Sequence, residues 1–120
     1  MKRRFSSQFL GMNSSLVYDG SFGYLIDPGV FPRETDRILN FIQDQRIENL
    51  VVLFTHTHGD HISGWHAFQH FPAYAHEIVR SKNETIREND VKYLKGMWRK
   101  QMIPGFDDLI FPDNLQYLAD

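Results

Sequence analysis

Residues 50–61 read LVVLFTHTHGDH, and the whole chain is interpreted outward from this stretch. The apolar, β-branched run at 50–54 predicts a buried strand. Four side chains able to bind a metal follow it within six residues: His56, His58, Asp60 and His61. Side chains two apart on an extended backbone point the same way, so the first two histidines can share one cation. Gly59 then lets the chain bend, and the spacing predicts a metal site with room for two ions.

Length and composition limit the other possibilities. A chain of 120 residues is at most one domain, so we expect a single domain over residues 1–120. An apolar content of 42% supports a core, and a net charge of −2 gives no reason to expect nucleic acid or anionic membrane as a partner. The absence of cysteine excludes a disulfide framework and a thiolate nucleophile. Neither a membrane span nor an apolar signal-peptide core is found in the sequence, so we expect a cytoplasmic protein.

The first half of the sequence predicts strands and one helix. Short, partly apolar runs at 5–10, 13–18 and 22–26 predict a meander of two or three strands, with Asp19-Gly20 as a hairpin turn. It ends at Asp27, which has two readings: a turn former, or a buried acceptor that braces a neighbouring loop. A helix is predicted from Pro32 to about residue 46. This order predicts a crossover, with the strands at 22–26 and 50–54 parallel.

The second half is predicted with less regular structure. We expect a short helix with Ser63 as its N-cap, a strand at 73–75, a helical turn at 76–80, a long helix at 81–101 and an irregular segment at 106–118. Seven of the thirteen basic residues lie between Arg80 and Lys100, near Tyr93 and Trp98. Such a segment is more often a solvated helix face than a basic-aromatic surface for a phosphate-bearing ligand.

Three further histidines lie outside the stretch. His66 and His70 are four apart on the predicted short helix, but Ala67 stands where the zincin motif requires Glu, so packing or surface positions are favoured. His76 follows a short strand and is interpreted as a core or pocket residue.

The HxHxDH pattern after an apolar strand resembles the signature loop of the metallo-β-lactamase superfamily of hydrolases. Residues 13–17 (NSSLV) resemble that family's early strand, and residues 25–29 (LIDPG) resemble its turn with an acid. The resemblance is good over about residues 10–80. It implies an α/β fold with a mixed sheet and flanking helices, one half of an αβ/βα sandwich.

The resemblance also implies roles for the residues of this chain. His56 and His58 resemble ligands of a first metal, and Asp60 and His61 ligands of a second; Asp60 would also orient the attacking water. Asp27 resembles the family's buried supporting acid, which favours the second of its two readings. The implied cofactor is two Zn²⁺ ions, with Fe or Mn compatible with the same ligands.

The implied reaction is metal-dependent hydrolysis of a small-molecule ester, thioester, lactone, lactam or phosphodiester. Two alternatives stay open: an iron-dependent oxidoreductase resembling the persulfide dioxygenases, and a truncated, non-catalytic metal-binding module. The family's later metal ligands have no counterpart here, since no histidine follows His76. Because a catalytic zinc typically has three protein ligands, we expect the isolated chain to be weakly active or inactive unless a second chain, a homo-oligomer or a missing segment completes the site.

Overall fold

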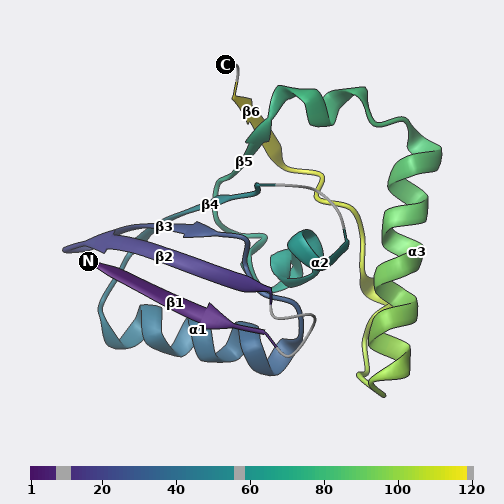
Figure 1. Cartoon of the computed structure of the whole chain (residues 1–120). Helices are drawn as coiled ribbons and strands as arrows, with labels where there is room; N and C mark the ends of the chain where they lie inside the picture. Colours follow the sequence, from purple (N-terminus) through teal and green to yellow (C-terminus); the bar gives the residue numbers. More distant parts are fainter. Residues whose placement is uncertain (8–11, 56–58, 119–120) are drawn as a thin grey trace.

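The computed structural model describes residues 1–7, 12–55 and 59–118, for Asp60 the backbone alone. These residues form one six-stranded sheet with the strand order β1-β2-β3-β4-β5-β6 and helices beside it (Figure 1). The strands are β1 (Lys2–Ser6), β2 (Asn13–Asp19), β3 (Phe22–Ile26), β4 (Asn49–Leu53), β5 (Ala73–His76) and β6 (Leu115–Leu118). The helical elements are α1 (Pro32–Asp44), α2 (Gly59–Ile62), η1 (Ser63–Phe68), η2 (Glu77–Ser81), α3 (Glu84–Lys100) and η3 (Phe106–Asp108).

The sheet is mixed, as predicted. β1, β2 and β3 pair antiparallel, and the β2–β3 hairpin turns at Gly20 with φ 59°. β3 and β4 pair parallel across α1, which confirms the predicted crossover, and β5 and β6 continue the parallel part. The first strand lies at 2–6 instead of within 5–10, and residues 8–10 of that predicted run lie outside the described residues.

One face of the sheet carries the core. Leu16, Leu25 and Val52 are opposite one another in the register of β2, β3 and β4, and none of them is exposed. α1 covers this face, and its buried Ile38 and Ile42 follow the predicted 3–4 spacing. Each such fully buried aliphatic side chain contributes about 1.5–3 kcal/mol.

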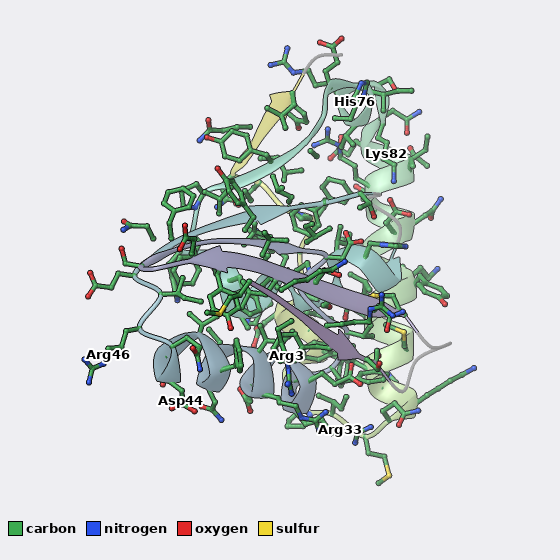
Figure 2. The ribbon with its side chains drawn as sticks, turned by 60° about the vertical axis from the view of Figure 1, so that its left-hand side comes forward. Arg3, Arg33, Asp44, Arg46, His76 and Lys82 are labelled. Carbon is green, nitrogen blue, oxygen red and sulfur yellow. The ribbon has the colours of Figure 1, made fainter. Side chains whose placement is uncertain are left out.

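The first strand is tied to α1 by its edge residues. The Arg3 guanidinium lies 5.4 Å from the ring centroid of Phe41 on α1, and Figure 2 shows Arg3 between β1 and that helix. Ser7 Oγ donates to the buried Glu34 carboxylate over 2.7 Å, and the same oxygen accepts from Phe31 N at the start of α1. Glu34 thus fixes both the helix N-terminus and the end of β1.

The opposite face of the sheet is open. Val17, Phe22 and Tyr24 point to it and are 42%, 44% and 43% exposed. This agrees with the surface expected for one half of a sandwich.

The C-terminal part differs from prediction. Residues 106–118, predicted to be irregular, contain η3 and the edge strand β6. The long helix is confirmed as α3, but Trp98 is 5% exposed and belongs to the core. Among the described residues, no helix combines the length and apolar character needed to cross a membrane.

Four of the seven basic residues between Arg80 and Lys100 lie over aromatic rings of the C-terminal segment. Arg87 and Lys82 lie over the Phe111 ring, Arg80 over Tyr117 and Arg99 over Phe106. These cations therefore attach the C-terminal segment to η2 and α3, with each exposed contact contributing about 0.5–1 kcal/mol.

Candidate metal centre

The centre begins where two parallel strands end at the same edge. Asp27 directly follows β3. Thr55 comes two residues after the end of β4, with Phe54 between them. The Asp27 N–H donates to Leu53 O over 2.8 Å, which extends the β3–β4 pairing by one step. Asp27 then adopts φ 56°, a left-handed conformation that Asp tolerates better than most residues, and the chain turns away. Asp27, which is 5% exposed, places its carboxylate beside the start of the signature loop.

Three donors surround the Asp27 carboxylate. Thr55 N donates to Oδ1 over 2.9 Å, and Thr55 Oγ1 donates to Oδ2 over 2.6 Å. His61 Nδ1 lies 3.0 Å from Oδ2. This is the arrangement expected of a buried acceptor, and it supports that reading of Asp27 over a simple turn former.

The same contacts assign the tautomer of His61. A carboxylate only accepts hydrogen bonds, so the Nδ1 atom that faces it must carry the proton. In a neutral imidazole the lone pair is then on Nε2, and that is the atom through which His61 can bind a metal. The side chain is 20% exposed, which is compatible with access for an ion.

The other three predicted metal ligands are His56, His58 and Asp60. His56 and His58 lie outside the described residues, and the side chain of Asp60 is not described, although its backbone is in α2. Within the described part of the chain no group of three or more potential ligand side chains comes together. The four-residue ligand set stays a prediction, with His61 as the member whose surroundings are known.

The helical segment after the loop is attached directly to the Asp27 turn. Gly64 N donates to Gly29 O over 2.9 Å, and Ser63 Oγ donates to Val30 O over 2.6 Å. Trp98 Nε1 on α3 donates in turn to Ser63 Oγ over 2.9 Å. These hydrogen bonds attach η1 both to the turn that follows Asp27 and to α3. They therefore fix the position of His61, just before η1, relative to Asp27.

The predicted short helix is present as η1, which follows α2, but Ser63 is not its N-cap: that position belongs to Ile62. Ser63 is 1% exposed. Its hydroxyl does not cap a helix because it donates to the Val30 carbonyl and accepts from the Trp98 indole. Trp65 and Phe68 of η1 pack into the core and are 1% and 0% exposed.

We expect Ser63→Ala to lower the free energy of unfolding by about 2–3 kcal/mol, because it leaves a buried carbonyl and a buried indole N–H without their shared hydroxyl. Urea denaturation followed by circular dichroism measures this. Ser81→Ala is the matched control: its exposed hydroxyl donates to Ile78 O over 2.7 Å, and its removal should change stability by less than about 0.5 kcal/mol. Equal losses in the two variants would contradict the role of Ser63.

Sequence reasoning missed two residues of this centre. Thr55 was read only as part of the loop, although a hydroxyl at the end of a strand beside an acid is a detectable signal. Gly64 was also missed, because an isolated glycine in a helical run is tolerated and does not by itself indicate a close backbone contact. The favoured surface positions of His66 and His70 agree with their exposure, and half-buried His76 caps η2 by accepting from Ile78 N.

The sequence profile of the metallo-beta-lactamase superfamily matches residues 8–116. The chain belongs to this superfamily. Solved structures agree on the fold of the superfamily. A candidate metallo-beta-lactamase from Thermotoga maritima superposes with a TM-score of 0.58 at 19% identity, covering 98% of this chain and 56% of that one. The metallo-beta-lactamase FIM-1 from Pseudomonas aeruginosa, in its mono-zinc form, gives 0.55 at 18% identity, covering 99% of this chain and 46% of that one.

A curated relative names one activity within the superfamily. The hydroxyacylglutathione hydrolase of Francisella tularensis subsp. novicida is 36% identical over 64 residues, which is 53% of this chain and 24% of that protein. The chain thus spans about half the length of the solved superfamily structures, as the expectation of a half-sandwich implies, and matches about a quarter of this relative.

Proposed function

We propose that the chain supplies the signature-loop side of a metal-dependent hydrolase site that acts on a small acylated substrate. The observation that carries the proposal is the Asp27 carboxylate, which accepts from His61 Nδ1 and from both Thr55 donors. Such a carboxylate–histidine pair is what orients a histidine that ligates a metal. Membership of a superfamily of hydrolases supports the same reading.

The donor set fits zinc. His56 and His58 would hold one ion, and Asp60 and His61 a second, since imidazole and carboxylate are ordinary zinc ligands. A bound metal supplies Lewis acidity, which polarises the electrophile and lowers the pKa of water. Asp60 would orient the attacking water, and Asp27 would keep the proton of His61 on Nδ1. Among the substrate classes, a thioester is favoured, because the curated relative is named for hydrolysis of acylated glutathione.

Two ligands for each ion are fewer than the three of a typical catalytic zinc. We therefore propose that a further segment or a second chain completes the site, and that this chain alone binds zinc weakly. Calorimetric titration of the 120-residue chain tests this, and tight binding of two ions per monomer would contradict it.

We expect His58→Ala to weaken zinc binding to this chain by at least about tenfold, because it removes one of the few ligands. His70→Ala is the control, since His70 is exposed and outside the loop, and it should titrate like the wild type. Identical titrations for the wild type and both variants would show that His58 does not bind zinc, which would contradict the predicted site.

The reaction class is tested separately. Elemental analysis after expression in supplemented medium identifies the metal, and the zinc-loaded protein is assayed with an acyl-glutathione thioester. Zinc content with thioester hydrolysis supports the proposal. Iron content with oxygen uptake on a persulfide would replace hydrolase with oxygenase, and absence of any bound metal would favour a non-catalytic module.

A further inference from the structure

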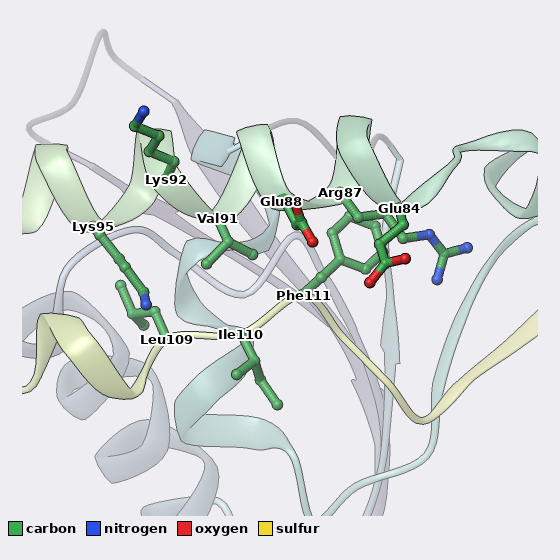
Figure 3. Close-up of a pocket in the computed structure, with 9 residues that line it drawn as sticks. All are labelled: Glu84, Arg87, Glu88, Val91, Lys92, Lys95, Leu109, Ile110 and Phe111. Carbon is green, nitrogen blue, oxygen red and sulfur yellow. The ribbon is translucent and has the colours of Figure 1, made fainter.

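A groove runs along α3, on a part of the molecule that the metal centre does not use. It lies between α3 and the C-terminal segment at 109–111 and has a volume of about 450 Å³ (Figure 3). Its apolar floor includes Val91, Phe111 and Ile110, and the last of these is 48% exposed. Together these side chains form one continuous apolar strip at the surface, which a partner can cover.

The charges along this groove are ordered. Glu84 and Glu88 line its half nearest the α3 N-terminus, and Lys92 and Lys95 line the other half. Within the described residues, neither an ion pair nor a hydrogen bond joins any of these four side chains to another group. The remaining cation in the lining is Arg87. Its guanidinium donates to Lys82 O and Val79 O and lies over the Phe111 ring.

The charge order along α3 is complementary to the same order on a second, antiparallel copy of α3. Along the sequence, the midpoint between Glu84 and Lys95 lies beside Asp90. The midpoint between Glu88 and Lys92 is Asp90 itself. Two such helices placed antiparallel about a two-fold axis near Asp90 therefore bring each glutamate opposite a lysine. Asp90 does not oppose its own copy as a bare charge, because it is paired with Lys82 at 2.8 Å.

We propose that a second copy of this chain occupies the groove, with its α3 antiparallel to the first. Glu84 then faces Lys95 of the partner subunit, Glu88 faces Lys92 of the partner subunit, and Val91 and Ile110 are covered near the axis. A parallel arrangement would place like charges together, and antiparallel helix dipoles also attract. This proposal is independent of the hydrolase chemistry.

The contact is expected to be weak. Exposed ion pairs contribute about 0.2–1 kcal/mol each, and one helix pair buries less area than a standard interface. We expect a dissociation constant in the micromolar range or above, rising with salt as the charges are screened.

Charge exchange tests the arrangement by sedimentation equilibrium at low salt. The double variant E84K/E88K makes all four of these side chains basic, and K92E/K95E makes all four acidic, while Arg87 stays bound to the chain itself in both. Each alone should associate at least about tenfold more weakly than the wild type, because like charges then face each other. An equimolar mixture of the two should regain association as a heterodimer, which no loss of folding can imitate.

The control is D44K/E48K, at two exposed acids near the end of α1, which changes the net charge as E84K/E88K does. Asp44 projects from the far side of α1 in Figure 2, away from α3, so this variant should associate like the wild type. A wild type that stays monomeric at millimolar concentration overturns the proposal. So does association that persists in both groove variants, which would place the contact elsewhere, for example on the open sheet face.

Discussion

Replacing Asp27 by Asn is expected to move the proton of His61 from Nδ1 to Nε2 and to weaken zinc binding about 10–100-fold. Asn tolerates the left-handed conformation that Asp27 adopts at φ 56°, so the backbone is not strained. Thr55 N must still find an acceptor at 2.9 Å, which fixes the amide oxygen at the Oδ1 position. The amide nitrogen then replaces Oδ2 and donates to His61 Nδ1, which can only accept if its proton has moved.

Two measurements follow the change in the metal-free chain and in its zinc complex. Nitrogen-15 chemical shifts of the His61 imidazole report the tautomer directly, and calorimetry reports the zinc affinity. Asp44→Asn, an exposed carboxylate at the end of α1, is the matched control and should alter neither. If Asp27→Asn leaves the imidazole protonated on Nδ1 and the zinc affinity unchanged, the supporting role of Asp27 is wrong.

The parts of this fold that the sequence predicts are those where local pattern and tertiary structure agree. The strand at 50–54 was found from its continuous apolar, β-branched run, and the stripe of Ile38 and Ile42 follows the 3.6 period that burial of one helix face enforces. Asp27 was found as a candidate because a strand end beside a Pro-Gly turn places an acid at the sheet edge. Its partner Thr55 was missed, although the predicted parallel pairing of the two strands brings the residues that follow them to the same edge of the sheet.

The errors have a common physical cause. β6 was missed because its residues, LQYL, have little strand signal and are ordered by pairing with β5 and by Arg80 over Tyr117. Ser63 resembled an N-cap because local sequence favours that use, yet a buried carbonyl and a buried indole 33 and 35 residues away compete for its hydroxyl. Long-range partners such as these leave no periodic trace in a single sequence.

Gly64→Ala is expected to be the most destabilising single substitution considered for this chain, lowering the free energy of unfolding by about 3 kcal/mol or more. A Cβ atom at Gly64 would lie 2.4 Å from Pro28 O and 2.6 Å from Gly29 O. Both are backbone atoms, and neither can rotate away as a side chain could. Relief requires η1 to separate from the turn, which breaks the 2.9 Å hydrogen bond from Gly64 N to Gly29 O.

The turn cannot yield instead, because Gly29 is already at φ 95° and Asp27 at φ 56°, so two of its three residues are in conformations that the surrounding contacts impose. Thermal unfolding should show a midpoint lowered by about 15 °C, as expected for such a loss in a domain of this size. Gly96→Ala is the matched control: nothing lies within 4 Å of its added Cβ, and alanine in the middle of α3 should raise stability by about 0.5–1 kcal/mol. A pair of variants that change stability in the same direction would contradict this account, since the same methyl group is added to a helical glycine in both. The opposite signs would show that η1 is held against the Asp27 turn at backbone contact, the condition that keeps His61 and Asp27 within 3.0 Å of each other.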